Sequence, residues 1–115
     1  MTEQKNRNPI PPLTDDERRA ALAKASRIRA ERMQLKRDLK QGLVTARQAF
    51  ELSDKGMDAA SGMRVEQLIM ALPDHGKAKA AAIMRKLDIS PSRRLRGIGV
   101  RQRLALLECV EGADR

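Results

Sequence analysis

The stretch between Lys77 and Arg103 is so highly charged that it restricts where the rest of the chain can place its core. Nine of its residues are Lys or Arg, against one acid, Asp88, so it carries +8 of the chain's formal +9. Charged side chains are almost never fully buried without a partner, so this stretch must lie at the surface. Helical surfaces usually mix signs, and a one-sided excess favours an anionic partner. An ordinary solvated surface is the alternative interpretation.

Two turns frame this stretch, and each is followed by an expected helix. In Pro73–Gly76 the proline cannot extend the preceding helix, and Gly76 is expected to adopt positive φ. The helix that follows starts with Lys77 and Lys79 in its first turn. In Arg96–Gly99 two glycines allow close backbone approach. A free helix N-terminus with cations beside it is suited to phosphate, so the two turns together predict a clamp on a polyphosphate.

The same stretch resembles a known family. The pattern comprises Ala71-Leu72-Pro73, Gly76-Lys77, Ala80, Ile83-Met84, Leu87, Ile89, Arg93-Arg94-Leu95-Arg96-Gly97, Gly99 and Arg101-Gln102, with Pro11-Pro12-Leu13-Thr14 and Arg18-Arg19-Ala20-Ala21-Leu22 upstream. In this pattern the chain resembles the actinobacterial integration host factors over most of Pro11–Glu108. The resemblance implies a helix-two-turn-helix motif that binds DNA, with roles in nucleoid compaction, DNA topology and phage integration.

The resemblance has one departure. The family turn usually reads Pro-Gly-Val-Gly-Lys, whereas Asp74-His75 stand here in place of Gly-Val. An acid therefore lies at the expected phosphate contact, which predicts a weaker hold on phosphate. Asp74 is expected to cap the next helix. His75 is expected at the exposed turn, near the phosphate.

Composition excludes several other classes. Phe50 is the only aromatic residue apart from His75, which argues against single-strand binders that stack bases on aromatic side chains. A single cysteine, Cys109, rules out an internal disulfide and a cysteine-rich zinc site. The sequence has neither a long apolar run nor a signal-peptide pattern, so we expect a soluble protein of the cytoplasm and nucleoid, without membrane contact.

Helix signals define the N-terminal part. Thr14-Asp15-Asp16-Glu17 forms a capping box, and Gly42 is a stop signal, so a helix is expected from about Asp15 to Lys40. Its apolar stripe is rich in alanine at the start and is interrupted by Arg32, so the first half should project as an arm. One side of this helix carries four aligned cations: Arg18, Arg29, Lys36 and Lys40. They form a second phosphate strip, a solvated face or a coiled-coil surface.

The remainder reads as shorter helices. Thr45–Gln48 begins a helix to about Ser53, residues 55–62 read as a loop, and Val65–Leu72 has unbroken helical periodicity. The last helix is expected from about Val100, with Leu104, Leu107 and Val110 facing inward. We therefore predict an all-α protein with a flexible basic tail over residues 1–12, a long helix over 13–42 and a compact helix-two-turn-helix domain over 43–112.

Nothing in the sequence supports an enzyme. His75 is the only histidine, which excludes a histidine metal triad, and its pairing with the distant Cys109 makes no convincing dyad. Asp15, Asp16 and Glu17 are explained by helix capping. We expect no catalytic residue, no metal, no cofactor and no small-molecule substrate.

The interpretation is a non-enzymatic architectural protein that binds double-stranded DNA with low sequence specificity and is monomeric off DNA. Phosphate contacts position a protein without reading sequence, so selectivity would rest on DNA shape. The expected DNA-binding residues are Gly76, Lys77, Lys79, Arg93, Arg94, Arg96, Gly97, Gly99 and Arg101, with His75, Arg18, Arg29, Lys36 and Lys40 as secondary contacts. Two alternatives are an RNA-binding protein of the ribosome and a protein-interaction module that uses the long helix.

Overall fold

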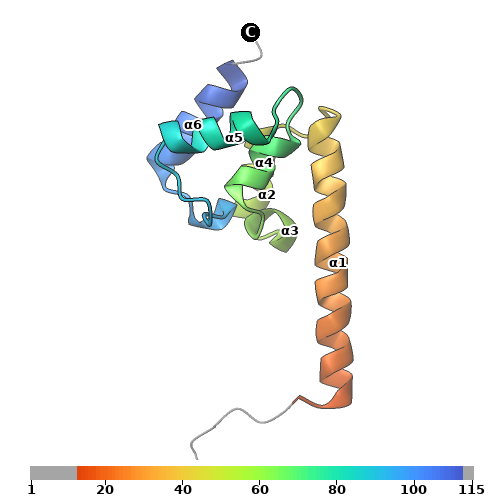
Figure 1. The fold of residues 1–115 in the computed structure, drawn as a ribbon. Coiled ribbons are helices and arrows are strands. Elements are labelled where there is room, and N and C mark those ends of the chain that lie inside the picture. The colour runs from red at the N-terminus through yellow and green to blue at the C-terminus, as the bar shows by residue number, and fades with distance from the viewer. Residues whose placement is uncertain (1–12, 113–115) are drawn as a thin grey trace, which may run out of the picture.

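The computed structural model describes residues 13–112, which fold into a cluster of helices from which the N-terminal helix projects (Figure 1). The elements in order are α1 (Asp15–Lys40), α2 (Ala46–Asp54), α3 (Asp58–Ser61), α4 (Val65–Ala71), α5 (Lys77–Lys86), the 3-10 turn η1 (Leu95–Gly97) and α6 (Val100–Gly112). Within residues 13–112 there is no strand; the one β-type pairing is a bridge between Arg64 and Arg94. The all-α prediction is confirmed, while the predicted tail over residues 1–12 lies outside the described residues.

Helix α1 has the bounds that its end signals predict. The Thr14 hydroxyl accepts a hydrogen bond from the Glu17 amide (3.1 Å), and the Glu17 carboxylate accepts one from the Thr14 amide (2.9 Å). At the other end, Gly42 has φ +79, and the next amide, that of Leu43, donates to the carbonyl of Asp38 (2.9 Å). This is the left-handed helix end for which glycine is suited.

The two halves of α1 have different surroundings. The first half projects beyond the other helices (Figure 1), and Leu22 there is 65% exposed. The second half buries Leu35 and Leu39 as α1 packs against α3 and α4. Only this half gains stability from tertiary contacts; the projecting half relies on helix propensity and its cap.

The core lies between α2, α4 and α6. Phe50 of α2 is fully buried at its centre, with Leu68 and Ile69 of α4 and Leu106 of α6. Helix α2 also has a complete capping box, in which the hydroxyl of Thr45 accepts from the amide of Gln48 (3.1 Å). The prediction that Ala46, Ala49 and Phe50 face the core is confirmed.

Two local predictions are wrong. The segment read as a loop contains α3, a single helical turn whose Ala59 and Ala60 are buried, so tertiary packing overrides the glycine and aspartate signals around it. In α6 the inward residues are Leu106, Leu107 and Val110, and Leu104 is 59% exposed. The buried face of α6 is thus rotated from the predicted one, although both choices satisfy helical spacing.

Candidate nucleic-acid interface

The turn between α4 and α5 is the first part of the candidate interface. Helix α4 ends at Ala71, the His75 amide closes the turn on the Leu72 carbonyl (3.2 Å), and α5 starts at Lys77. No side chain caps α5, so the backbone N–H groups of its first turn point out of the helix without an intramolecular side-chain acceptor. Lys77 and Lys79 are exposed beside them. The helix dipole and the two lysines are the features on which the prediction of a phosphate contact rests.

The backbone of this turn differs from the prediction. The residue with positive φ is Asp74 (φ 62), whereas Gly76 is extended (φ −119). Asp74 therefore occupies the left-handed position, which aspartate tolerates better than most residues. Its carboxylate does not cap α5; instead its carbonyl oxygen accepts a hydrogen bond from Lys79 Nζ (3.1 Å). A Cβ at Gly76 would meet nothing within 4 Å, so this glycine leaves open space in front of the amides.

His75, expected at the surface of the turn, is buried with 5% of its surface exposed. Its Nδ1 lies 2.8 Å from the Pro73 carbonyl oxygen, and its Nε2 has no hydrogen-bond partner in the described part of the chain. The His75 ring is held at the inner side of the turn by this contact with the Pro73 carbonyl. His75 faces a partly enclosed cavity of about 220 Å³ that Leu39, Ala46 and Val110 also line. It is not available for an external phosphate.

The arginine turn, residues 93–97, is the second part of the candidate interface, and main-chain bonds fix it in place. The Val65 amide donates to the Arg93 carbonyl, and the Leu95 amide donates to the Met63 carbonyl, both at 2.9 Å. These two bonds enclose the bridge between Arg64 and Arg94, and Leu95 is 3% exposed in the core. The turn therefore presents its arginines from a rigid backbone, because the residue between them is a core anchor.

The three arginines of this turn have different roles. Arg96 is exposed, with no hydrogen bond or ion pair inside residues 13–112. Arg93 is exposed and donates to the Gly97 carbonyl (3.2 Å). Arg94 is half-buried, and its Nη1 donates to the Gly62 carbonyl (2.5 Å), which places it in a structural contact. Arg94 was predicted as a candidate for a DNA groove alongside Arg96; the structure holds Arg94 against the Gly62 carbonyl and leaves Arg96 exposed.

Gly97, the last residue of this turn, and Gly99, which follows it, do not need special conformations. Neither Gly97 nor Gly99 has positive φ, and a Cβ at either would meet its nearest neighbours at 3.6 Å, an ordinary contact. Gly99 precedes α6, and the side chain of Gln102 accepts a bond from its amide (3.4 Å). Arg101 in the first turn of α6 is exposed.

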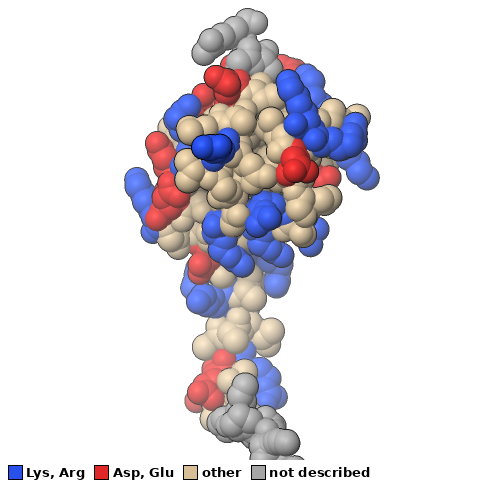
Figure 2. All heavy atoms as spheres, turned by 90° about the vertical axis from the view of Figure 1, so that its left-hand side faces the viewer, with Lys and Arg blue, Asp and Glu red and all other residues tan. Residues whose placement is uncertain are grey.

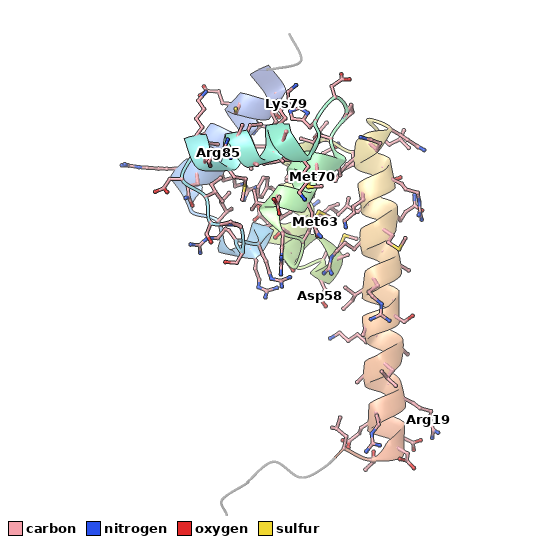
Figure 3. All side chains as sticks on the ribbon, in the orientation of Figure 1. Arg19, Asp58, Met63, Met70, Lys79 and Arg85 are labelled. Carbon is pink, nitrogen blue, oxygen red and sulfur yellow. The ribbon has the colours of Figure 1, made fainter. Side chains whose placement is uncertain are left out.

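The two turns do not form one small clamp. Helix α5 begins beside the C-terminal end of α1, whereas η1 lies at the other end of the domain, against α2 and α3 (Figure 1). Figure 3 shows Lys79 and Arg85 at opposite ends of α5. Viewed from the side on which η1 lies, Lys and Arg side chains form one group on the lower part of the domain and another at its upper right (Figure 2). The predicted sites are brought onto one domain as two separate contact points.

The four cations predicted as a strip on α1 are Arg18, Arg29, Lys36 and Lys40. Arg18, Arg29 and Lys40 are exposed, and Lys36 is half-buried. The arm thus carries positive charge from its free end to its root. One member is held locally, since Arg18 donates to the Leu13 carbonyl (3.1 Å).

The sequence interpretation missed two residues near the arginine turn. Arg32, taken as an interruption of the apolar stripe of α1, donates from Nε to the Ala59 carbonyl (3.0 Å) and from Nη2 to the Asp58 carbonyl (3.4 Å). Arg64 is exposed and pairs through its backbone with Arg94. An arginine inside an otherwise apolar stripe was the available signal, because such a residue must find polar partners on the neighbouring element.

One cation of the stretch between Lys77 and Arg103 forms contacts within the protein itself. Arg103 forms two hydrogen bonds with the Asp54 carboxylate (3.0 and 2.9 Å), and its guanidinium lies 4.8 Å from the centroid of the Phe50 ring. The hydrogen bond from Arg103 lowers the pKa of Asp54 from its usual value of 3.8. This pair closes α6 onto α2, so Arg103 contributes to the fold more than to the contact surface.

No group of three or more His, Cys, Asp or Glu side chains within residues 13–112 could hold a metal ion. None of the helices in this part of the chain is both long and apolar enough to cross a membrane.

The chain is similar to known proteins over most of its length. Residues 39–109 match the model of the S13-like H2TH domain, which covers the segment from the end of α1 to α6. The chain is 50% identical over 100 residues to proteins named integration host factor in Mycolicibacterium smegmatis and Mycobacterium tuberculosis, covering 86% of this chain and 93% of each relative. It is 40% identical over 99 residues to the integration host factor of Streptomyces coelicolor, covering 86% and 91%.

A solved structure also matches. It is described as sIHF bound to an 8-base-pair palindromic DNA, and it aligns with a TM-score of 0.69 and 36% identity over 73% of this chain and 93% of that one. At 36% identity the two chains share sequence as well as fold.

Proposed function

Because this chain belongs to the family of integration host factors of mycobacteria and Streptomyces, we propose that it is a non-enzymatic architectural protein that binds double-stranded DNA. The observation that carries the proposal is the arginine turn, residues 93–97, whose side chains project from a backbone fixed to residues 63–65. The similarity to a protein solved with DNA bound supports duplex DNA as the partner over ribosomal RNA.

In this proposal residues 43–112 form the DNA-binding unit and residues 13–42 the arm. Lys77, Lys79 and the free amides of α5 hold one phosphate group, and Arg93 and Arg96 hold others at the far end of the domain. Gly76, Gly97 and Gly99 let the backbone approach the duplex. Arg101 lies at the edge of this contact surface. Most of these contacts would go to phosphates, so they fix position and give little sequence preference.

Two separated contact points on one rigid domain are suited to shaping DNA. A duplex that reaches both points follows the domain surface, and arginines are favoured where a narrowed minor groove raises the negative potential. We therefore propose roles in nucleoid compaction, DNA topology and support of phage integration, with the protein in the cytoplasm and on the nucleoid.

The test is a titration of a fluorescent duplex repeated at several salt concentrations. If about five to eight phosphates are neutralised, the logarithm of the binding constant should fall with the logarithm of salt concentration with a slope of roughly −5 to −7. A slope near zero would contradict the proposal. Structured RNA added as a competitor should displace the duplex poorly; equal competition would favour the ribosomal alternative.

The matched variant replaces Arg93 and Arg96 with alanine and keeps Arg94. Replacement of all three arginines would also remove the bond from Arg94 to the Gly62 carbonyl and would confuse binding with folding. The double variant should lose most of its duplex affinity while its helical circular dichroism and melting temperature stay near those of the parent.

A further inference from the structure

Three arginine side chains from two distant parts of the chain meet around one glycine, Gly62. Arg32 reaches across from α1 to the carbonyls of Asp58 and Ala59, and Arg94 reaches from the arginine turn to the carbonyl of Gly62 itself. A Cβ at position 62 would lie 2.7 Å from Arg32 Nη2 and 3.7 Å from Arg96 Nη1. The guanidinium groups of Arg32 and Arg96 therefore lie against the same glycine.

This cluster has no negative charge to balance it. None of the three arginines forms an ion pair within residues 13–112, and Asp58 contributes its main-chain oxygen alone. Like charges brought together repel each other unless an anion lies between them. The carbonyl oxygens of Asp58, Ala59 and Gly62 carry partial negative charge and reduce this repulsion. They do not balance the full positive charges of the arginines.

Donors remain available for such an anion. A guanidinium has five N–H donors. Arg32 uses Nε and one N–H of Nη2 in bonds to α3, and the second of these bonds is solvent-exposed. Arg96 makes no bond inside the described part of the chain and is exposed. The forks of two guanidinium groups match the oxygens of a phosphate.

We infer that Arg32 of α1 and Arg96 of the arginine turn form a composite phosphate site at Gly62, with Arg94 as the positioning residue that holds the turn beside it. This inference rests on the proposed function and assigns it a DNA backbone contact that spans the arm and the domain. Figure 3 shows Asp58, at the start of α3, at the lower end of the domain on the side that faces α1. A phosphate bound here would connect the arm to the domain.

Gly62 is part of the site because it lacks a side chain. Its φ of −88 is one that any residue can adopt, so conformational freedom does not explain the glycine. An alanine would push against the end of the Arg32 side chain, which can move, and would approach the Asp58 carbonyl oxygen at 3.2 Å. Substitution should therefore displace the Arg32 guanidinium without removing its charge.

The first test compares Arg32→Ala with Arg27→Ala in the full chain. Both remove one arginine from α1, but Arg27 is exposed and makes no bond within residues 13–112. Loss of one phosphate contact should make the salt slope less steep by about 0.9, which corresponds to an affinity about eightfold lower at 0.1 M monovalent salt. Arg27→Ala should leave the slope unchanged. Equal effects of the two variants, or no change in slope for Arg32→Ala, would overturn the inference.

The second test separates binding from structure, because Arg32→Ala also removes two bonds to α3. Gly62→Ala should weaken duplex binding in the parent but have no further effect in the Arg32→Ala background, since both act on the same contact. Additive losses would show that Gly62 acts independently of Arg32 and would overturn the site. If Arg32→Ala fails to fold, Arg32→Lys replaces it in the cycle, as it keeps the charge but cannot form the fork.

The parent titration distinguishes the two proposals. A parent that does not bind duplex with a steep salt slope removes the proposed function and this inference with it. A parent that binds as expected, with an unchanged slope in Arg32→Ala, removes the composite site alone.

Discussion

At the scale of single residues, Asp74 was expected to weaken the hold on phosphate and to cap α5, and the backbone at this position changes what its substitution should do to stability. Asp74 has φ 62 and its side chain does not cap α5. Glycine adopts this conformation without strain. Asp74→Gly should therefore melt at the same or a higher temperature than the parent. It should also bind duplex about fivefold more tightly, because a negative charge near the α5 amides costs about 1 kcal/mol of binding free energy.

Asp88 provides the matched control. Within residues 13–112 it is the other non-glycine residue with positive φ (57), and it follows the C-terminal end of α5. Asp88→Gly relieves the same backbone strain and removes the same charge, but it does so at the C-terminal end of α5, away from the free amides of the first turn. Anisotropy titrations of both variants should show the larger gain for Asp74→Gly. Equal gains would mean that net charge alone, and not the turn between α4 and α5, determines the affinity.

A second residue-scale prediction concerns pH. The bond from Arg103 lowers the pKa of Asp54 in the folded protein, so the folded state binds this proton less readily than the unfolded state. The stability from this pair is present above the usual pKa of 3.8 and is lost as pH falls through the lower folded pKa. Asp54→Asn should therefore lower the melting temperature at pH 7, and the difference from the parent should shrink below about pH 4 and vanish at the acid end.

Glu108→Gln is the control for this pH series, because Glu108 is an exposed carboxylate on α6 that makes no bond within residues 13–112. Its melting curve should follow that of the parent at every pH. A constant difference between Asp54→Asn and the parent down to pH 2 would show that the loss is one of packing and not of the charged pair.

At the scale of elements, the two capping boxes make a controlled pair. Thr14 caps a half-helix that projects from the domain, and Thr45 caps α2, whose Phe50 is the centre of the core. An N-cap threonine contributes about 1 kcal/mol. Thr45→Ala should lower the free energy of global unfolding by about that amount in a urea titration. Thr14→Ala should leave it unchanged and instead speed amide hydrogen exchange in the first turns of α1. Equal global losses would indicate that the arm folds together with the domain.

The cationic strip on α1 gives the second element-scale prediction. Arg18 and Arg29 lie on the strip, whereas Lys24 and Arg27 lie on other faces of the same half-helix. If the strip contacts phosphates, Arg18→Gln with Arg29→Gln should reduce the salt slope by about 2. The double substitution of Lys24 and Arg27 with glutamine, which removes the same charge, should reduce it much less. Identical slopes would assign the strip to a solvated face.

The sequence predicted the helix ends correctly where the interactions that set them join residues close together in the chain. The capping residues Thr14 and Thr45 and the stop at Gly42 mark their helix ends because each interaction spans a few residues. Helix α3 was missed because buried alanines, and not its polar sequence, stabilise it. The bonds from Arg32 to Ala59 and from Arg94 to Gly62 join residues 27 and 32 positions apart. The local pattern signals that Arg32 needs polar partners, but it does not show which residues these are. The site residues could be predicted as cations, but their division into structural and free groups could not.

At the scale of the whole molecule, the shape gives a prediction about assembly. The radius of gyration is 18.2 Å and the longest dimension is 65 Å, against about 13 Å for the radius of a compact domain of similar length. Within residues 13–112, the large exposed apolar residues lie on two separate parts of the molecule: Leu13, Leu22, Met33 and Leu43 on or next to α1, and Val100 and Leu104 on α6. Scattered apolar residues do not form an association surface. We expect a monomer without DNA, with a sedimentation coefficient below that of a sphere of 12.8 kDa. A mass near twice this value would instead support pairing through α1.

The way in which α1 is fixed has a mechanical consequence. Its root is held by Leu35, Leu39 and the Arg32 contact, while the helix from Arg32 to Asp15 extends freely over about 26 Å. A stiff rod fixed at one end works as a lever. A rotation of about 10° at the root would carry the tip through roughly 4–5 Å. Small rearrangements around Gly62 would therefore be magnified at the far end of α1, where a distance measured between Leu22 and α2 would record them.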